Sequence, residues 1–402
     1  MITIQYLEDA PDLAGRKVAE VVLKLREAAR RLPISHLLIG WNLPGQLLEA
    51  CRKEAERLGI KFLRWHPLLT GDGVFQPLPK WQVIGASGRY VPGFRSIPEF
   101  TFVCPNHPEV QEAISRRLEE LLREGLYQGY FLDRVRFPSP TTHPIDHLGC
   151  FCVFCRERAI AYNLDLDFIR KVVLSLDSTA EGRLSLVQVL LKGEVERLPG
   201  ELANHLQAYL DFRSNVVTDF VATLSRSLRA AGMEIGLDCF SPSLTNMVGQ
   251  DLGALSAWAD WIKVMSYAHV RGPAGIPFEL LGIFDYLCGA GVADPANILD
   301  SIGEAIGLRL PVERAILEKE GIPSESLEDE LRRGVASCSI PILAGFELVE
   351  VPGVAELNKP QVFRDLGAVR RSGVAGLSIS WDLWRIPLER LDWVRQGYID
   401  NL

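Results

Sequence analysis

Acidic side chains stand near the carboxyl ends of several short apolar segments that have the pattern of buried β-strands. The segment 129–138 reads GYFLDRVRFP and places Asp133 after an apolar run. Pro138 closes this strand because proline has no N–H for the β-ladder. Asp238, Glu347 and Asp382 hold similar positions in the later segments EIGLDCFSP, PILAGFELVE and VAGLSISWDL. Carboxylates at the same end of different strands could meet in one site.

Two carboxylates that face each other across an apolar-walled cleft can hydrolyse a glycosidic bond. One is protonated and donates to the leaving oxygen, while the other is ionised and attacks carbon or activates water. We predict that Asp133 is the ionised member because arginines follow it closely, and that Glu347, in the more apolar AGFELVE, is the acid. Asp238 and Asp382 are alternatives for either role. Internal ion pairs, such as Asp238 with Lys263, would explain the same pattern without catalysis.

Aromatic and basic residues accompany these carboxylates at the predicted strand ends. Sugar rings pack their C–H faces on aromatic planes, so this placement favours a carbohydrate cleft. Side chains alternate along a strand, so Arg64 and His66 are expected to share the inward face of the third strand. The predicted substrate-binding residues are Trp41, His66, Arg134, Arg136, Lys263, Tyr267 and Trp381. Ordinary packing is the alternative for each aromatic residue taken alone.

A group of cysteines forms a second candidate site. The stretch 149–155 reads GCFCVFC and supplies Cys150, Cys152 and Cys155. Structural zinc takes four N or S ligands in a tetrahedron, and Cys104 is the predicted fourth, with His143 and His147 as alternatives. A closed shell of four thiolates leaves no open position, so we expect a structural rather than a catalytic zinc. Free cysteines are the alternative.

Short strand segments alternate with amphipathic helical segments along the chain. The predicted strands are 2–7, 36–41, 61–67, 129–138, 234–242, 260–268, 341–350 and 374–383. The predicted helices are 14–31, 47–58, 108–124, 201–231, 252–258, 278–288, 296–308, about 311–335, 361–371 and 387–398. This order predicts an α/β fold of the (β/α)8 TIM-barrel type. An open doubly wound sheet is the alternative, although the first turn, EDAPDLAG, lacks the glycine pattern G-x-G-x-x-G.

Two segments interrupt this alternation. Residues 68–100, after the third strand, are rich in Gly, Pro and aromatic residues, which favours an ordered and functional loop. Residues 139–198, after the fourth strand, read as an insertion that carries the cysteines and several helices. We therefore predict one domain, 1–402, with an insertion at about 139–198.

Composition narrows the classes of partner. The net charge of −8 argues against nucleic acid and anionic membranes as partners. The sequence shows neither an export signal at its start nor an uncharged apolar run of about 18 residues, so no membrane span is expected. The eight cysteines are spread over the full length, and five have no close partner in sequence, so they do not form a disulfide framework, which favours a cytoplasmic protein. We expect no organic cofactor, and the sequence gives no indication of oligomeric state.

Several stretches together resemble a known family. They are GYFLDRVRFPSP, GCFCVFC, GLDCFSPSLTNMVGQDLGAL, DWIKVMSYAHVRGPAG and GLSISWDL, and over roughly 100–385 the chain resembles the barrel glycoside hydrolase-like proteins. The resemblance implies a (β/α)8 barrel that acts on glycosidic bonds. It carries over Asp133 as a catalytic carboxylate and, by a weaker match to the family, Glu347. The cysteine cluster with Cys104 also resembles the structural zinc site of the zinc-carrying beta-galactosidases. Their Asn-Glu pair is absent, since this chain has Leu132-Asp133-Arg134 at the corresponding strand end. Their acid and base residues and their substrate are therefore not transferred.

The sequence thus predicts a glycoside hydrolase with a carbohydrate substrate. A non-catalytic carbohydrate-binding barrel is one alternative, and a metal-dependent or other barrel hydrolase is another. The seven histidines are scattered and form no H-x-H or H-E-x-x-H, which counts against the metal-dependent enzyme.

Overall fold

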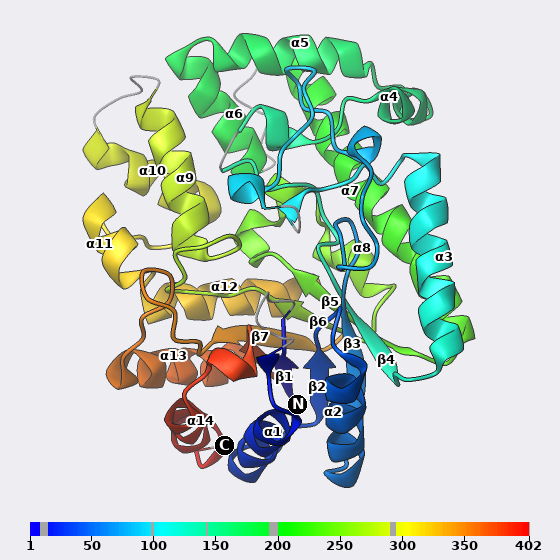
Figure 1. The fold of residues 1–402 in the computed structure, drawn as a ribbon. Coiled ribbons are helices and arrows are strands. Elements are labelled where there is room, and N and C mark those ends of the chain that lie inside the picture. Colours follow the sequence, from blue (N-terminus) through cyan, green and yellow to red (C-terminus); the bar gives the residue numbers. More distant parts are fainter. Residues whose placement is uncertain (9–14, 98–99, 142–143, 193–199, 290–294, 402) are drawn as a thin grey trace.

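Eight parallel strands form a closed barrel in the computed structural model, which describes residues 1–8, 15–97, 100–141, 144–192, 200–289 and 295–401. Each strand pairs with its neighbours in sequence, and β8 closes the barrel by pairing with β1 (Figure 1). The strands are β1 (Ile2–Tyr6), β2 (His36–Ile39), β3 (Lys61–Pro67), β4 (Gly129–Asp133), β5 (Glu234–Cys239), β6 (Trp261–Val264), β7 (Ile342–Glu347) and β8 (Gly376–Ser380). The predicted TIM barrel is confirmed.

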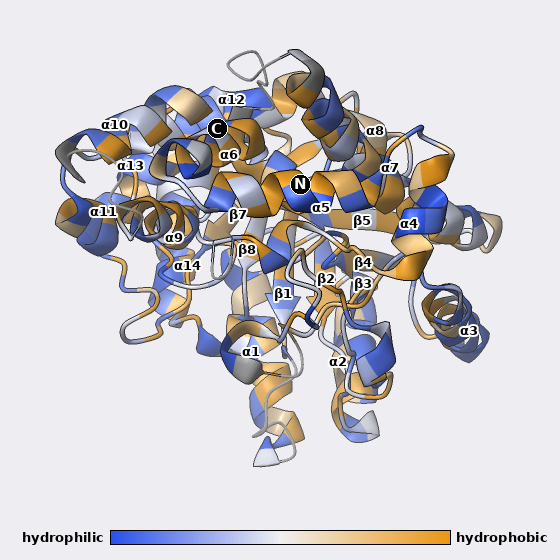
Figure 2. Ribbon diagram, turned by 90° about the horizontal axis from the view of Figure 1, so that it is seen from above, coloured by the Kyte–Doolittle hydropathy of each residue, from blue (hydrophilic) through white to orange (hydrophobic). Residues whose placement is uncertain are grey.

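Helices follow the strands and surround the barrel. They are α1 (Val18–Arg31), α2 (Gly45–Arg57), α3 (Pro108–Glu124), α4 (Val153–Ile160), α5 (Leu166–Asp177), α6 (Ala180–Lys192), α7 (Gly200–Ala230), α8 (Leu252–Ser256), α9 (Ile276–Cys288), α10 (Pro295–Ile306), α11 (Arg314–Glu320), α12 (Ser324–Ser337), α13 (Lys359–Ser372) and α14 (Leu388–Val394). Hydrophilic and hydrophobic residues alternate along these helices (Figure 2). In α1, for example, Val21, Leu25 and Ala28 are buried at a spacing of three or four residues.

The predicted helix at 311–335 is wrong in one respect, because two helices, α11 and α12, occupy this stretch. Gly321 separates them with a φ of 74°, a left-handed conformation that glycine adopts without a steric penalty. Pro323 follows and caps the start of α12. The closing helix is also interrupted, since α14 passes into a π-helical turn at Arg395–Ile399. The start of the first predicted helix, at residue 14, lies outside the described residues.

Large apolar side chains fill the interior of the barrel. This interior cluster consists of Leu38, Trp41, Leu63, Trp65, Phe131, Trp261 and Leu343. The rings of Trp41 and Trp65 meet edge to face with centroids 5.0 Å apart, and those of Phe131 and Trp261 stack at 5.4 Å. A filled interior of this kind is typical of TIM barrels and leaves the rim as the place for a site.

The predicted orientation of the third strand is wrong. Leu63 and Trp65 face the interior, so Arg64 and His66 lie on the opposite face of β3. The reason is electrostatic, because Arg64 Nη2 lies 2.9 Å from Oδ2 of the fully buried Asp72. Asp72 comes from the loop after β3 and also pairs with Arg117 of α3 at 3.2 Å. The Asp72 carboxylate therefore bridges the two arginines between the barrel and α3.

Two long connections cover the carboxyl end of the barrel. The loop after β3 contains the short helices η2 (Pro79–Trp81) and η3 (Phe94–Ser96), with antiparallel bridges from Gln82 to Val103 and from Ile84 to Tyr90. The insertion after β4 contains the short helix η5 (Asp146–Leu148) and the helices α4, α5 and α6, which gather at the top of Figure 1. The short helices and bridges give the described part of the loop after β3 local structure, and its predicted functional role stays a prediction.

Within the described part of the chain, no helix has the length and apolar character needed to cross a membrane. The cytoplasmic location and the single-domain organisation stay predictions.

Candidate active site

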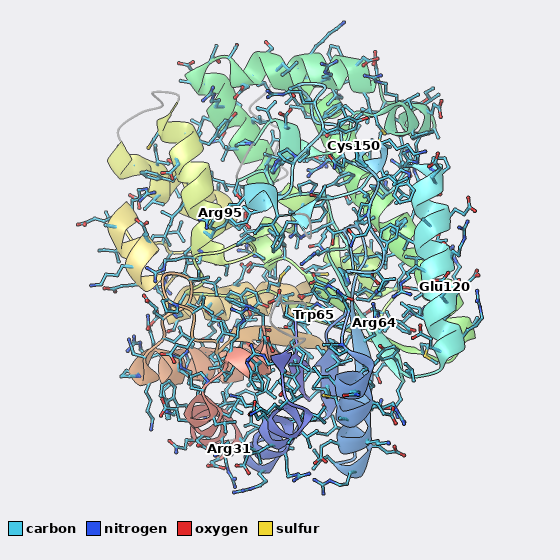
Figure 3. All side chains as sticks on the ribbon, in the orientation of Figure 1. Arg31, Arg64, Trp65, Arg95, Glu120 and Cys150 are labelled. Carbon is cyan, nitrogen blue, oxygen red and sulfur yellow. The ribbon has the colours of Figure 1, made fainter. Side chains whose placement is uncertain are left out.

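A pocket of about 190 Å³ opens at the carboxyl ends of the strands. Active sites of TIM-barrel enzymes are found at this end of the barrel. Six predicted site residues line the pocket: Asp133, Arg134, Arg136, Asp238, Tyr267 and Trp381. Trp65 of β3, which is labelled near the centre of Figure 3, also lines the pocket. The sequence therefore identified most of the ionisable lining.

Asp133 is the last residue of β4 and sits at the rim. Its Oδ2 accepts a hydrogen bond from Nε1 of Trp65 at 3.0 Å, and its Oδ1 accepts one from the backbone N–H of Arg134 at 2.5 Å. Arg134 has a φ of 56°, which is uncommon for a residue other than glycine and turns the chain immediately after the strand. Two N–H donors thus orient this carboxylate toward the pocket and suit its ionised form.

Arg134 and Arg136, which follow β4 in the chain, line the pocket together with Asp133. The Arg134 guanidinium lies over the ring of Phe100 at 4.7 Å and over that of Trp41 at 5.4 Å. It also donates to Oγ1 of Thr70 at 2.8 Å. Trp41 itself is 1% exposed and does not line the pocket, so the structure places it as a support beneath the site.

A buried polar network forms the floor of the pocket. Lys263 Nζ donates to Oδ2 of Asp238 at 2.9 Å and to Oε1 of Gln5 at 2.9 Å, and Ser380 Oγ donates to the same Gln5 oxygen at 2.7 Å. Burial raises the pKa of Asp238 to about 7, although the Lys263 charge opposes the rise. The ion pair that was the structural alternative for Asp238 is therefore present. Tyr267 stands above it, with the Lys263 ammonium 5.2 Å from its ring centre.

Glu8 is a lining residue that sequence analysis missed. It lies two residues beyond the end of β1, at the same rim as Asp133. Burial raises the pKa of Glu8 to about 7, the nearby Asp382 adds to the rise, and Arg134 opposes it. Its position directly after the predicted first strand, 2–7, is the signal that could have identified it.

Glu347 and Asp382 do not line the pocket. Glu347 Oε1 accepts the backbone N–H of His269 at 2.8 Å, and burial raises the pKa of Glu347 to about 7. Asp382 Oδ1 accepts the backbone N–H groups of Leu7 at 2.9 Å and Trp384 at 3.0 Å, which caps the short helix η7 (Leu383–Arg385). The structure does not bring either residue into the pocket with Asp133.

His66 is also outside the pocket. It is 3% exposed, lies on the outer face of β3 and accepts a hydrogen bond at Nδ1 from Nε of Arg64 at 3.3 Å. Burial lowers the pKa of His66 to about 3, and the Arg64 charge adds to that effect. The substrate-binding role predicted for it is therefore not supported by its position.

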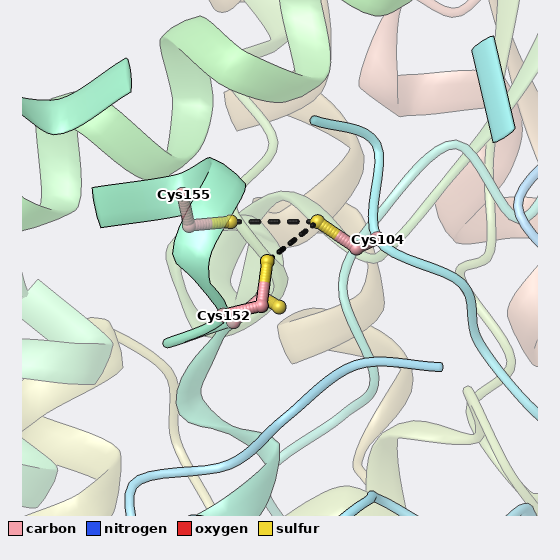
Figure 4. Close-up of side chains that lie close together, drawn as sticks. Cys104, Cys152 and Cys155 are labelled. Atoms are coloured by element: carbon pink, nitrogen blue, oxygen red, sulfur yellow. Dashed lines mark hydrogen bonds between the residues drawn. The ribbon is translucent and has the colours of Figure 1, made fainter. Parts of the chain in front are cut away.

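The four predicted cysteines come together in the upper loops. The Sγ atoms of Cys104, Cys150, Cys152 and Cys155 all lie within 4.8 Å of one another, and all four residues are buried. Cys104 Sγ is 3.4 Å from Cys155 Sγ and 3.6 Å from Cys152 Sγ (Figure 4). A tetrahedral zinc with bonds of about 2.3 Å would set its sulfurs about 3.8 Å apart, so this donor set fits the metal.

Two further contacts suit thiolates at this centre. The backbone N–H of Ile84 points at Cys150 Sγ at 3.4 Å, and Nδ2 of Asn106 points at Cys155 Sγ at 3.3 Å. The alternative ligand His147 has its Nδ1 at 2.8 Å from the carbonyl oxygen of Ser139. The other alternative, His143, lies outside the described residues. The cluster thus links the loop after β3 to the start of α4.

Fold and site together define a closed parallel barrel whose carboxyl rim holds a pocket lined by both carboxyl and guanidinium groups. No family model and no curated protein matches the chain in sequence. Similar solved structures include the PgaB (BpsB) glycoside hydrolase domain from Bordetella bronchiseptica, at 12% identity and TM-score 0.55, over 98% of this chain and 94% of that one. The catalytic domain of beta-amylase from Paenibacillus polymyxa has 11% identity and TM-score 0.51, over 100% of this chain and 98% of that one. Alpha-L-fucosidase isoenzyme 2 from Paenibacillus thiaminolyticus has 10% identity and TM-score 0.54, over 99% of this chain and 48% of that one.

These comparisons establish the shared barrel fold. None of the three structures is named as a beta-galactosidase, so the resemblance of the cysteine cluster to the zinc site of those enzymes stays a prediction.

Proposed function

We propose that this protein is a glycoside hydrolase that uses Asp133 and Glu8 as its pair of carboxyl groups. The observation that carries the proposal is that the side chains of Asp133, Glu8 and Asp238 line one pocket at the barrel rim. Paired carboxyl groups with different protonation states are the equipment for this reaction. The solved structures with the same fold are named as a glycoside hydrolase domain, a beta-amylase and a fucosidase, which supports the same class of substrate.

Asp133 takes the role of the ionised nucleophile or base. Its two N–H donors hold it in place without neutralising it. Glu8 takes the role of the acid, because a pKa of about 7 keeps part of the population protonated at neutral pH. The ion pair with Lys263 gives Asp238 a positioning role at the pocket floor.

The pocket walls suit a sugar ring. Trp65, Tyr267 and Trp381 contribute aromatic surface, and Phe100 contributes a further ring from the loop after β3. Aromatic faces bind the C–H faces of sugars, while Gln5 and the charged groups offer hydrogen bonds to hydroxyls. A carbohydrate is therefore the proposed partner.

Hydrolysis of a broad panel of aryl and natural glycosides tests this proposal. We expect at least one substrate to be cleaved by the wild-type protein, and both Asp133→Asn and Glu8→Gln to lose most of that activity. Glu347→Gln is the matched comparison, because Glu347 was the acid predicted from the sequence. Loss of activity in Glu347→Gln with full activity in Glu8→Gln would restore the sequence-based pair. Binding of sugars without any cleavage would favour the carbohydrate-binding alternative.

We also propose that Cys104, Cys150, Cys152 and Cys155 hold a structural zinc ion. The four buried thiols supply a complete tetrahedral donor set, so the metal has no open position for substrate. Zinc would tie the loop after β3, which supplies Phe100 to the pocket, to the insertion after β4, which follows the segment that carries Arg134 and Arg136. Its contribution to function would be the stability of these walls.

A further inference from the structure

A second, smaller pocket of about 40 Å³ adjoins the first. Phe100, Arg136 and Pro273 line both pockets, so the two form neighbouring parts of one cleft. The smaller pocket has aromatic walls from Phe94 and Phe278, whose ring centroids are 5.6 Å apart. Of the residues that line this smaller pocket, only Arg136 was predicted from the sequence to bind substrate.

Arg136 stands at the junction without a direct carboxylate partner, although the charges of Asp133, Glu279 and Asp238 act on it from beyond ion-pair distance. It is 6% exposed, and its guanidinium lies between the rings of Phe102 at 4.8 Å and Phe240 at 4.5 Å. One nitrogen, Nη1, donates to the carbonyl oxygen of Phe137 at 3.1 Å, whereas the buried Nε has no hydrogen-bond partner. Among the described residues, Arg136 forms no ion pair within 4 Å. A guanidinium offers five N–H donors, so most of them are available here.

Two other buried arginines of the chain have hydrogen-bond acceptors or an ion-pair partner that Arg136 lacks. Arg64 pairs with the Asp72 carboxylate at 2.9 Å. Arg213 donates to two backbone carbonyl oxygens, those of Asn246 and Met247. Burying a cation without such partners costs several kcal/mol unless something else supplies the missing acceptors. Burial accordingly lowers the pKa of Arg136 to about 10.

The nearby carboxylate of Glu279 lines the smaller pocket but does not supply the missing acceptors for Arg136. Its Oε2 accepts the hydroxyl groups of Ser139 and Thr141, the latter at 2.6 Å, and its Oε1 accepts the backbone N–H of Ala274 at 2.8 Å. These bonds hold Glu279 to the surrounding loops and leave the guanidinium of Arg136 facing the junction of the pockets. A planar carboxylate is the acceptor that matches a guanidinium edge with two parallel hydrogen bonds.

We propose that the cleft binds an acidic oligosaccharide, with adjacent sugar units in the two pockets and a sugar carboxylate held by Arg136. This inference rests on the proposed glycoside hydrolase function and names its substrate class. The aromatic rings of each pocket contact the sugar faces, and the flanking rings of Phe102 and Phe240 keep the guanidinium plane fixed. A neutral sugar would offer the free N–H groups of Arg136 no charged acceptor in direct contact.

Binding measurements test the inference independently of cleavage. The probes are uronic-acid trisaccharides of several linkages, each matched with the carboxyl-reduced trisaccharide of the same linkage, and the readout is calorimetry or ligand-observed NMR. We expect at least one acidic trisaccharide to bind about tenfold to a hundredfold more tightly than its reduced partner, which is the range for hydrogen bonds to a charged group. Arg136→Gln removes the preference, Arg136→Lys keeps part of it, and Arg95→Gln, at an exposed arginine of η3, keeps all of it.

Equal affinity within every matched pair, or a preference that survives Arg136→Gln, would overturn the inference, as would no binding of any trisaccharide at millimolar concentration. The matched pairs decide the question on the wild-type protein even where an Arg136 variant does not fold. Cleavage of neutral glycosides without any acid preference would leave the proposed function in place and remove only this inference. Tighter binding of acidic trisaccharides without cleavage of any glycoside would support this inference and contradict the proposed hydrolase function.

Discussion

The indole Nε1 of Trp65 donates a hydrogen bond to Oδ2 of Asp133 at 3.0 Å, and this contact joins the ends of two neighbouring barrel strands. Trp65 belongs to the packed interior of the barrel, so its ring cannot move away from the carboxylate without disturbing that packing. The carboxylate is therefore positioned by the core of the fold rather than by a loop.

Trp65→Phe should lower kcat by about tenfold or more, because a hydrogen bond to a charged group is worth about 1.5–3 kcal/mol. The matched control is Trp261→Phe, since Trp261 Nε1 donates to Oε1 of Glu234 at 2.9 Å, at the start of neighbouring strand β5. This control should reduce the melting temperature but not kcat. Equal kcat losses in the two variants would mean that the Trp65 contact has only a structural role.

The activity should fall as the pH rises above about 7. Glu8 must be protonated to act as the acid, and its pKa of about 7 places the loss of the proton in that range. A pH profile of kcat/KM on the best substrate measures this fall, which is the alkaline limb of the profile. Glu8→Gln should abolish the limb together with most of the activity, whereas an unchanged limb in this variant would assign the titration to another group.

Removal of zinc should destabilise the protein. Metal analysis is expected to give one zinc ion per chain, and a strong chelator or Cys155→Ser should lower the melting temperature, because metal binding to four thiolates is coupled to folding. Cys288→Ser changes a partly buried thiol outside the cluster and serves as the control. Protein that contains no metal and has eight freely titratable thiols would contradict the zinc proposal.

The free energy of unfolding should decrease between pH 7 and pH 9. His269 Nε2 lies 2.7 Å from Oδ2 of Asp365, and although burial opposes it, this contact raises the pKa of His269 from 6.5 to about 9. A raised histidine pKa stabilises the folded state fully below about 6.5, and the stabilisation is lost as the pH rises toward 9. The expected loss from pH 7 to pH 9 is about 2 kcal/mol, from linkage at 1.36 kcal/mol per pKa unit.

Urea unfolding at several pH values measures this decrease. His269→Gln should remove this contribution and flatten the curve between pH 7 and pH 9. The same slope in the variant and in the wild-type protein would show that the histidine does not titrate in this range.

The strand order and most strand orientations could be predicted, because alternating side chains in a closed barrel must point either inward or outward. Phe131 with Asp133, and Lys263 with Tyr267, follow that rule. The orientation of the third strand could not be predicted. Its sequence alternates between Leu63 and Trp65 on one face and Arg64 and His66 on the other, and this pattern does not show which face points inward. The partner that decides it, Asp72, comes from a loop with no periodic pattern.

The candidate site was predictable where its residues end a strand and unpredictable where they come from connections. Asp133 and Asp238 were found in this way. Glu8 was missed because it lies beyond the predicted end of the first strand, and Glu279 because its role depends on contacts with distant loops. The cysteine cluster was predictable because Cys150, Cys152 and Cys155 lie within six residues of the chain, and the structure brings their thiols together with that of Cys104.

The most direct test of the central claim is chemical rescue of Asp133→Ala. This variant should lose at least about a hundredfold in kcat, the range for a positioned acid–base or nucleophilic group. Added azide or formate, which can occupy the space of the missing carboxylate, should restore part of the rate in a concentration-dependent manner, while the melting temperature stays close to that of the wild-type protein. An Asp133→Ala variant that cleaves the substrate within about threefold of the wild-type rate, with or without added anion, would contradict the role assigned to Asp133.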